Sequence, residues 1–334
     1  MRVGVIGYGY WGPNLVRNYM ESEKTELVYV CDLREQVLEG VTRKYPTVKI
    51  TTSISEVLES DELDAVSIAT PVDTHYELTI KALQAGKHVL VEKPMADSSE
   101  KCQRMIQAAK DAGKILMVDH TFPYTGAIEK IQQLLDSGEL GTMQYFDSTR
   151  INLGLFQHDV SVIWDLAVHD LSIMEALFDY KPYGVSATGI AHVEGSPVNT
   201  AFMTLYYNEP FIAHINVSWL APVKLRQTLI GGSDKMVLYD DMEPEEKVKI
   251  YDKGITLTPN EKDIIKIKVG YRTGDMTAPK LRRIEALSSL VNHFADVVEK
   301  GVKPITSAES GARIVRILEA ATESLKLQGT LIKL

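Results

Sequence analysis

The sequence predicts an α/β protein with a doubly wound parallel sheet in its N-terminal part and a second α/β domain with a large open, mostly antiparallel sheet. Three observations predict this fold class. Short β-branched runs alternate with helical patterns over the first 120 residues, strand patterns then follow one another from about residue 141, and 334 residues suffice for roughly two domains of about 150 residues. We therefore expect one domain at residues 1–120 and another at residues 121–334.

Six strand patterns carry the expected first domain. They are mostly continuous apolar runs, as expected for parallel strands that are covered on both faces. The strands are expected at residues 3–6, 27–31, 48–51, 65–69, 88–91 and 115–118. Between them, Ser53 with Glu56 and Asp97 with Glu100 have the spacing of a helix capping box, and Gly86 and Gly113 stand where a left-handed residue ends a helix.

The second domain starts with strand patterns that few helices interrupt. The strands are expected at residues 142–151, 184–193, 201–207, 211–219, 225–231 and 236–239, and the helices at 160–178, 286–300 and 308–327. Apolar residues of the last helix recur at helical spacing, so we expect a buried stripe that could pack against the first domain. The acidic stretch at 240–246 is typical of a solvated turn.

Composition excludes several classes of protein. The 36 basic and 45 acidic residues give a net charge of −9, which argues against a surface for nucleic acid or anionic membranes. No run approaches the eighteen apolar residues of a membrane span, and Met1 leads into a strand rather than a signal peptide, so we expect the mature chain to start near Met1. Cys31 and Cys102 stand far apart, which fits a reducing compartment, and we expect a cytoplasmic protein.

Gly7-Tyr8-Gly9-Tyr10-Trp11-Gly12 matches the dinucleotide-binding pattern G-x-G-x-x-G, between a buried strand and a helix that Pro13 can open. Gly7 permits a tight turn, Gly9 lets a pyrophosphate approach the backbone, and Gly12 lets the helix pack close to the strand. The alternative is that these glycines only mark turns. Because strand, loop and helix follow in the right order, we favour a Rossmann domain.

Asp32 follows the second strand, 25 residues beyond Gly7. A carboxylate there can accept hydrogen bonds from both adenosine ribose hydroxyls and would repel the 2′-phosphate of NADP, so we favour NAD over NADP. The guanidinium of Arg34 could instead reach a phosphate. We expect Arg34 to be a solvent-facing residue at a helix start, because Asp32 has the closer position.

Glu92-Lys93-Pro94 follows the fifth strand, at the carboxyl edge where doubly wound sheets bind their ligands. Pro94 favours an extended backbone at Lys93, which restricts the direction of its side chain, and the ammonium group could stabilise a developing alkoxide. The alternative is a solvated loop lysine.

Asp165 and His169 are four residues apart in the helical pattern at 160–178, so we expect them on one face, with Ser172 a further turn along. The rest of that helix is largely apolar, which suggests that this polar column faces a cleft. The unperturbed pKa of histidine, about 6.5, suits proton removal near neutral pH. The alternatives are a surface Asp–His pair and a satisfied core histidine.

Further polar residues follow other strand ends. His75 comes shortly after Thr70-Pro71, and His120 and Tyr124 come after the sixth strand. All are possible crevice residues, although His75 could instead cap a helix start and His120 could serve packing or a turn. We interpret Trp11, Trp164 and Trp219 as packing residues rather than stacking partners of a ligand. No cluster has metal-ligand spacing, and no serine nucleophile elbow is present.

Together these motifs resemble the glucose-fructose oxidoreductase, inositol dehydrogenase and rhizopine-catabolism (Gfo/Idh/MocA) family over almost the whole chain. The resemblance rests on Gly7 to Gly12, Ala69-Thr70-Pro71 with His75, and Ala85-Gly86-Lys87-His88-Val89 before Glu92-Lys93-Pro94. Lys93 falls on the family's catalytic lysine, and Asp165 and His169 fall on its Asp-x-x-x-His pair. The resemblance implies a C-terminal sheet that commonly forms oligomer interfaces, hence a homodimer or homotetramer, and chemistry at a sugar or cyclitol carbon.

The substrate is expected to be a sugar, and more narrowly a nucleotide sugar. Many family members have glycines where Ser161-Val162-Ile163-Trp164 precede Asp165 here. The stretch from Gly9 to Asn14 and the Trp164-Asp165 pair resemble members of nucleotide-sugar metabolism, for instance UDP-N-acetylglucosamine 3-dehydrogenases. The alternatives are a keto-sugar reductase, an inositol or free-sugar dehydrogenase, and a regulatory protein that binds a nucleotide without catalysis.

Overall fold

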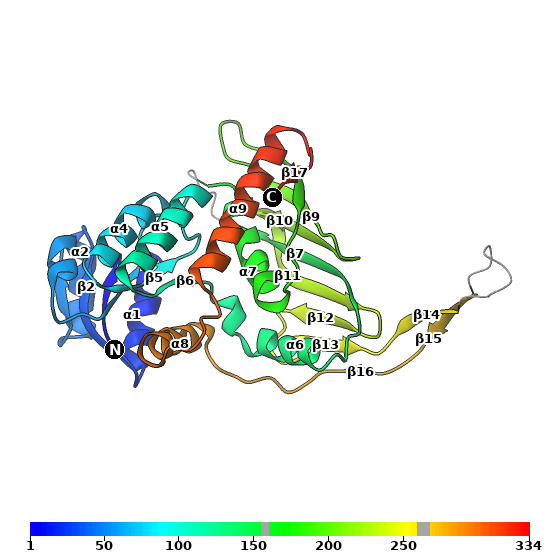
Figure 1. Ribbon diagram of the computed structural model, residues 1–334, viewed down its shortest axis with the longest axis horizontal. Coiled ribbons are helices and arrows are strands. Elements are labelled where there is room, and N and C mark those ends of the chain that lie inside the picture. Colours follow the sequence, from blue (N-terminus) through cyan, green and yellow to red (C-terminus); the bar gives the residue numbers. More distant parts are fainter. Residues whose placement is uncertain (155–159, 259–267) are drawn as a thin grey trace. The chain divides into compact units, whose positions relative to one another are not determined.

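The computed structural model of the chain describes residues 1–154, 160–258 and 268–334. They form two compact units (Figure 1). The first comprises Met1–Thr125 and Arg283–Glu319, and the second comprises Gly126–Arg282 and Ala320–Leu334. The first unit thus includes C-terminal residues that the expected division at residue 120 assigns to the second domain.

The first unit contains a parallel sheet of six strands in the order β3-β2-β1-β4-β5-β6. The strands are β1 (Arg2–Ile6), β2 (Glu26–Cys31), β3 (Lys49–Thr51), β4 (Ala65–Ile68), β5 (His88–Glu92) and β6 (Leu116–Asp119). Their ends lie within one residue of the expected positions, which confirms the doubly wound sheet. The strand order reverses between β1 and β4, and folds of this kind bind nucleotides at the carboxyl ends of the strands beside such a reversal.

Helices follow most of these strands. They are α1 (Gly12–Glu21), α2 (Glu35–Lys44), α3 (Ile54–Glu59), α4 (Val72–Gln84), α5 (Ser99–Ala112) and a 3₁₀ turn, η1 (Phe122–Tyr124). The hydroxyl of Ser53 accepts from the Glu56 amide as expected, and Gly113, with φ 63°, ends α5. The expected cap at Asp97 is wrong by one residue, because Ser98 accepts from the Lys101 amide.

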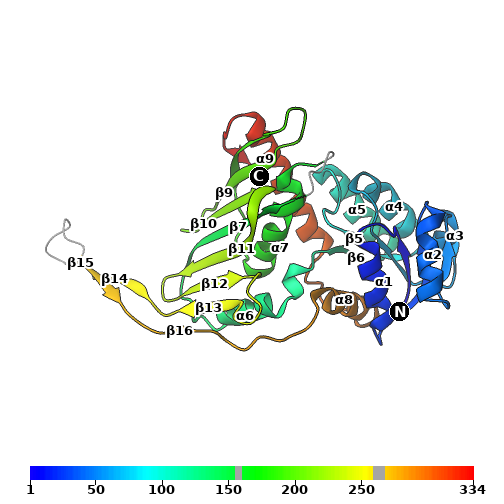
Figure 2. The same ribbon diagram turned by 180° about the vertical axis from the view of Figure 1, so that it is seen from behind.

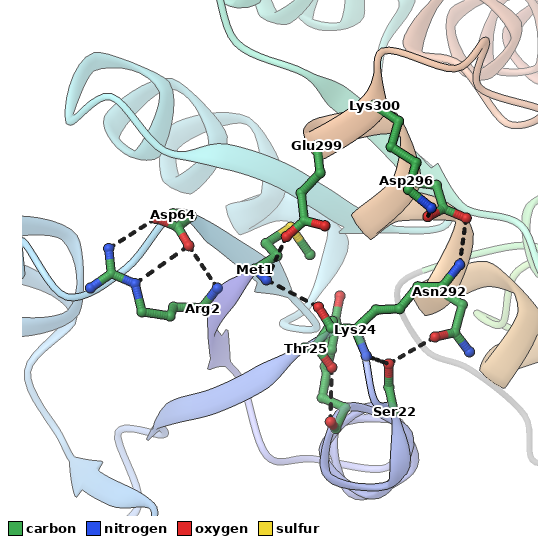
Figure 3. Close-up of polar contacts among 11 residues, drawn as sticks. Met1, Arg2, Ser22, Lys24, Thr25, Asp64, Asn292, Asp296, Glu299 and Lys300 are labelled. Atoms are coloured by element: carbon green, nitrogen blue, oxygen red, sulfur yellow. Dashed lines mark hydrogen bonds and ion pairs between the residues drawn. The ribbon is translucent and has the colours of Figure 1, made fainter.

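The helix α8 (Ala286–Lys300) completes the core of the first unit although it comes late in the sequence. Its apolar residues Leu290, Val291 and Phe294 are buried in the same cluster as residues of β1, β2 and α1. Figure 3 shows the polar contacts around this packing: the Lys24 ammonium group pairs with Asp296 at 2.6 Å, and the amino group of Met1 pairs with Glu299 at 2.7 Å. The helix α9 (Ala308–Lys326) contributes its first part, as far as Glu319, to the same unit.

The second unit contains a nine-stranded sheet in the order β16-β13-β12-β11-β7-β10-β9-β8-β17 (Figure 2). The pair β7–β10 is parallel and every other neighbouring pair is antiparallel, which confirms a mostly antiparallel second sheet. The strands are β7 (Met143–Leu153), β8 (Gly184–Ile190), β9 (Thr200–Tyr206), β10 (Ile212–Ser218), β11 (Leu220–Gly232), β12 (Met236–Asp240), β13 (Val248–Tyr251), β16 (Met276–Thr277) and β17 (Ile332–Lys333). The strands β14 (Gly254–Thr258) and β15 (Lys268–Arg272) form a separate antiparallel pair.

Two expected strand ends in the second unit are wrong. The strand expected at 184–193 ends at Ile190, because the Asn199 amide donates to the Ile190 carbonyl and closes the following turn. The strand expected at 225–231 begins earlier, at Leu220. Its pairing with β7 shifts register between Leu220 and Leu225, and this irregular stretch accommodates Pro222, which a regular ladder would exclude.

Helices of the second unit are α6 (Gly126–Asp136), a π-helical turn at Ile163–Ala167, α7 (Val168–Leu177) and the end of α9. The sequence analysis missed α6, although Ile128, Ile131 and Leu134 are buried at helical spacing. The single α-helix expected at 160–178 is also wrong, because a π-helical turn occupies its first part. The acidic stretch is exposed at its end, but Asp241 is mostly buried and pairs with Arg226 at 3.1 Å.

A buried ion pair joins α7 to β7. The guanidinium of Arg150 donates to both carboxylate oxygens of Asp170, at 2.8 and 3.0 Å, and the hydroxyl of Ser148 donates to the same carboxylate at 2.7 Å. The two side chains of the ion pair are only 4% and 1% exposed. A carboxylate in such a setting depends on its partner, because an unpaired buried charge is strongly unfavourable.

We expect Arg150→Met to destabilise the second unit by about 3–5 kcal/mol, because the substitution keeps most of the side-chain volume but leaves the Asp170 charge without its cation. Denaturant unfolding followed by circular dichroism would measure the loss. Arg104→Met, which removes an exposed guanidinium paired with Glu100, is the matched control and should leave the transition unchanged. A parent-like transition for Arg150→Met would contradict the assignment.

Candidate active site

The loop after β1 is shaped by backbone contacts that exclude side chains at two of its glycines. Gly7 has φ 99°, its amide donates to the Cys31 carbonyl at 2.7 Å, and a β-carbon there would lie 2.4 Å from the Ala69 carbonyl oxygen. A β-carbon on Gly12 would lie 2.2 Å from the Gly7 carbonyl oxygen. A β-carbon on Gly9 would meet only Arg34 Nη2, at 3.8 Å. The loop is therefore closed at Gly7 and Gly12 and open at Gly9.

This arrangement fits the pyrophosphate of a dinucleotide. The helix α1 begins at Gly12, Pro13 occupies its first turn, and that turn contains no acidic residue. The free amide groups of a helix N-terminus attract a phosphate, and an acidic side chain there would compete with it. Tyr10 is 93% exposed on the same loop. These residues could hold NAD, with its phosphates at Gly9.

The Asp32 carboxylate lies at the end of β2 and accepts four hydrogen bonds. The Tyr8 amide donates at 2.8 Å, the Arg34 amide at 2.9 Å, and the Arg34 guanidinium at 2.9 and 3.0 Å. Burial alone would raise the pKa of Asp32, but the bonds from Arg34 and Tyr8 hold it below its usual value. Arg34 precedes α2, and its side chain is 58% exposed while it pairs with Asp32.

His75 connects two of the strand-end loops. Its ring is buried in α4, with Nε2 2.8 Å from the Thr70 carbonyl oxygen and Nδ1 3.0 Å from the Pro94 carbonyl oxygen. Pro71 directly precedes α4, and burial lowers the pKa of His75. The contact of Gly7 with Ala69 and the two contacts of His75 thus join the glycine loop, the Thr70 loop and the Lys93-Pro94 loop.

Acidic and basic side chains gather at the ends of β5 and β6. Glu92 and Asp119 are register partners, the Lys93 amide donates to the Glu92 carboxylate, and Trp11 Nε1 donates to Asp119 Oδ2 at 3.0 Å. Burial and the Asp119 charge raise the pKa of Glu92 well above its usual value. Burial likewise raises the pKa of Asp119 to about 6, although the Trp11 bond and the Lys93 charge oppose the shift.

His120 and Tyr124 lie next to this group and are almost completely buried. Burial, reinforced by the Lys93 charge, lowers the pKa of His120 to about 3, so its ring is neutral. Within the described part of the chain, neither ring nitrogen of His120 has a hydrogen-bond partner. The Tyr124 hydroxyl contacts the Thr306 hydroxyl at 3.3 Å, and burial raises its pKa.

The second unit holds Asp165 in the π-helical turn and His169 in the first turn of α7. Trp219 Nε1 donates to Asp165 Oδ2 at 3.0 Å, and the Ser172 hydroxyl donates to the His169 carbonyl at 2.7 Å. Because π-helical turns are wider than α-helical turns, the four-residue spacing lacks the regular geometry expected from sequence. Such turns are frequent at functional sites. The expectation that these residues and Lys93 act on one substrate stays a prediction, since they belong to different units.

The hydrogen bonds of the three tryptophans and the pairing of Glu92 with Asp119 were not predicted from the sequence. Trp11, Trp164 and Trp219 each donate an indole hydrogen bond, to Asp119, Thr322 and Asp165. The sequence analysis also passed over Asp119. The sequence does contain a pattern that indicates Asp119. When the ends of the fifth and sixth strand patterns are aligned, Asp119 lies beside Glu92.

The described residues also bear on two other classes of site, metal centres and membrane-spanning helices. Within these residues, no three histidine, cysteine or acidic side chains are grouped as a metal ion would require. No helix in the described ranges has both the length and the apolar composition needed to cross a membrane.

Two family models match consecutive parts of the chain. The model of an oxidoreductase family with an NAD-binding Rossmann fold matches residues 1–120, and the model of the GFO/IDH/MocA C-terminal domain matches residues 128–237. The protein is thus an oxidoreductase with an NAD-binding domain. Its sequence is 30% identical over 268 residues to UDP-N-acetylglucosamine 3-dehydrogenase of Acidithiobacillus ferrooxidans, covering 78% of this chain and 79% of that protein. The chain belongs to the GFO/IDH/MocA family.

Other relatives cover different shares of the chain. An uncharacterized oxidoreductase of Streptococcus pneumoniae is 30% identical over 207 residues, which span 58% of this chain and about half (54%) of that protein. The scyllo-inositol 2-dehydrogenase (NADP(+)) of Bacillus subtilis is 24% identical over 99% of this chain and 95% of its own. The solved structure of the Acidithiobacillus ferrooxidans enzyme has a TM-score of 0.83 at 24% identity and covers 98% of both chains, which shows the shared fold.

We expect Gly9→Ala to weaken NAD binding and Gly12→Ala to lower the stability of the fold. An added methyl group at Gly9 has room in the protein but would occupy the space of the pyrophosphate, so NAD binding should weaken about tenfold or more while the melting temperature stays unchanged. At Gly12 the methyl group would meet a backbone carbonyl, so the melting temperature itself should fall. Isothermal titration calorimetry and thermal unfolding would separate the two effects. Parent-like NAD affinity in Gly9→Ala would contradict the assigned phosphate position.

Proposed function

We propose that this protein is an NAD-dependent dehydrogenase of a sugar secondary alcohol, and that its substrate is a nucleotide sugar such as UDP-N-acetylglucosamine, oxidised at carbon 3. The observation that carries the proposal is the connection of Lys93 to the glycine loop. His75 contacts the carbonyls of Thr70 and Pro94, and Gly7 packs against the residue before Thr70. A cation is therefore held in the same part of the molecule as the cofactor loop.

In this proposal Lys93 donates a hydrogen bond to the substrate oxygen and stabilises the negative charge that develops there. His169 accepts the proton of the substrate hydroxyl group. Asp165 positions the sugar, and the indole of Trp219 fixes its carboxylate. NAD, when bound, supplies the hydride acceptor. Removal of the hydroxyl proton and the carbon-bound hydride converts the alcohol to a ketone.

NAD is favoured over NADP because the Asp32 carboxylate is held in its charged form at the end of β2. The negatively charged 2′-phosphate of NADP would be repelled by this carboxylate. The Arg34 guanidinium already pairs with Asp32, so binding of NADP would require it to exchange one anion for another. An inositol dehydrogenase that uses NADP is among the relatives, and that substrate class and cofactor are the second candidates.

Two other functions compete with the proposal. A reductase that converts a keto-sugar would use the same residues in reverse, so the proposed site fits both directions. A regulatory protein could bind the nucleotide without catalysis, but it would have no chemical need for Lys93, Asp165 and His169 together. A measurable turnover therefore distinguishes an enzyme from a regulatory protein. The relative rates of alcohol oxidation and ketone reduction distinguish the dehydrogenase from the reductase.

We also propose that the protein acts in the cytoplasm. Cys31 and Cys102 are both free and buried. Burial raises the pKa of both thiols, to about 11 and about 12, which keeps them protonated and unreactive. Thiols without a structural role are typical of a reducing compartment.

The uncovered face of the second sheet supports a homodimer or homotetramer. Figures 1 and 2 show α7 against one face of this sheet. On the opposite face, Phe202 and Ile212 are 45% and 47% exposed, and His214 stacks on Phe202 and pairs with Asp147. Large apolar side chains gathered on an open sheet are typical of a protein–protein interface.

We expect the purified protein to convert NAD to NADH, followed at 340 nm, with a member of a panel of nucleotide sugars, free sugars and inositols. UDP-N-acetylglucosamine should react fastest, and NADP should react more slowly than NAD because of Asp32. Lys93→Ala and His169→Ala should each lower kcat/KM at least about tenfold, which corresponds to about 1.4 kcal/mol of transition-state stabilisation.

These variants should still bind NAD, which titration calorimetry would verify. Parent-like turnover in both variants would overturn the assigned roles. Nucleotide binding without turnover of any panel member would favour the regulatory protein.

We expect sedimentation velocity to show a dimer or tetramer, and Phe202→Asp with Ile212→Asp to shift it toward the monomer, because two buried charges disfavour the interface. Val302→Asp, at an apolar residue of the first unit that is 40% exposed, is the matched control and should keep the parent assembly. A monomeric parent protein would contradict the proposed interface.

A further inference from the structure

Glu92 and Asp119 form a pair of carboxyl groups at the carboxyl ends of β5 and β6. They are direct register partners in adjacent parallel strands, so their side chains leave the sheet on the same side, with backbones about 4.8 Å apart. Asp119 is only 2% exposed. Its Oδ2 accepts from Trp11, whereas its Oδ1 has no hydrogen-bond partner among the residues that the structure describes.

The groups that face this pair come from four elements. Within the described part of the chain, Lys93 after β5, Tyr19 on α1 and Tyr124 in the 3₁₀ turn interact electrostatically with the carboxyl pair, and His120, which follows Asp119 after β6, interacts with Lys93. Burial lowers the pKa of His120 to about 3 and raises the pKa of both tyrosines, so these three groups carry no charge near neutral pH. Among the residues that the structure describes, Lys93 carries the positive charge that acts on both carboxyl groups.

Two neighbouring carboxyl groups in this setting do not lose their protons together. The second negative charge would meet the first in a buried position, so one proton is retained over a range of pH. The pKa of Asp119, raised to about 6, and the pKa of Glu92, raised by burial and by the Asp119 charge, agree with the retention of a proton. Asp119 therefore gains its negative charge between about pH 5 and pH 7, and this charge opposes the ionisation of Glu92.

We propose that the Glu92–Asp119 pair reads the oxidation state of the bound cofactor by releasing a proton when NAD⁺ binds and none when NADH binds. The inference rests on the proposed function: a nicotinamide ring that accepts the hydride of a substrate held by Lys93 would lie near Lys93, at this edge of the sheet. The oxidised ring carries a positive charge and the reduced ring carries none. The deprotonated pair therefore attracts the oxidised form selectively.

The direction of the pH dependence follows from this attraction. A positive ring stabilises the charged carboxylate, so the pKa of the pair is lower in the NAD⁺ complex than in the free protein. The affinity for NAD⁺ then rises with pH between about 5 and 7, by at most tenfold for each pH unit because a single proton is released. The affinity for NADH lacks this dependence.

Trp11 links the pair to the cofactor loop. Its indole stands one residue before Gly12 and donates to the carboxylate that loses the first proton. The bond favours the charged form of Asp119, so its removal shifts the titration to higher pH. Asp119 is thus a positioning residue for the loop as well as a titrating group.

The test measures the dissociation constants of NAD⁺ and NADH for the full-length protein by isothermal titration calorimetry at pH 5, 6, 7 and 8. Protein groups whose titration changes the affinity for both nucleotides equally do not affect the ratio Kd(NAD⁺)/Kd(NADH). We expect it to fall about three- to tenfold between pH 5 and pH 7 in the parent. Asp119→Asn should remove this fall, and Trp11→Phe should move its midpoint to higher pH. The exposed control Asp111→Asn should behave as the parent.

A second readout counts the proton directly. Calorimetry at pH 6 in two buffers of different ionisation enthalpy should show fractional proton release on NAD⁺ binding to the parent and none for NADH or for Asp119→Asn. A flat ratio in the parent, or an unchanged slope in Asp119→Asn, would overturn the inference while leaving the proposed function intact. Failure of either nucleotide to bind would overturn both.

Discussion

The closeness of two backbones at Gly7 and Gly12 is the constraint on which the first unit depends. A β-carbon at either position would meet a carbonyl oxygen at 2.4 or 2.2 Å, so only glycine lets β1 turn beside Ala69 and lets α1 begin against that turn. The helix α1 then begins at Gly12, and a β-carbon at Gly9 would meet only the Arg34 side chain within 4 Å. Gly7 and Gly12 therefore specify the turn itself, whereas the open position at Gly9 leaves space for a pyrophosphate.

The other strand-end loops are attached to this one by side chains. His75 uses both ring nitrogens to contact carbonyls of the two loops that flank it, and Trp11 reaches from the glycine loop to Asp119. Both contacts lie at the carboxyl edge of one parallel sheet, where strand ends are aligned by register rather than by sequence distance. Residues that are up to 108 positions apart in the sequence consequently contact one another at this edge of the sheet.

Sequence patterns specified the first sheet to within one residue because its strands are continuous apolar runs with glycine-marked ends. The second sheet was predicted less well. Pro222 argues against a strand, and only the irregular register opposite β7 makes room for it. The π-helical turn at Asp165 likewise has no local signal, since its sequence is also compatible with an α-helix. The bond from Trp219 to Asp165 and the alignment of Asp119 with Glu92 arise from tertiary pairing, which periodicity does not contain.

The charges around Lys93 show why the carboxyl pair matters for the chemistry. A lone ammonium group beside the nicotinamide would repel the oxidised ring, although the substrate oxygen requires that cation as its own charge develops. One negative charge on Glu92 and Asp119 offsets the ammonium, whereas two would neutralise its effect on the substrate. Burial and mutual repulsion of the carboxyl groups both oppose the second negative charge, which favours retention of one proton by the pair. The retained proton thus lets one cluster accommodate a cationic ring and still polarise a substrate oxygen.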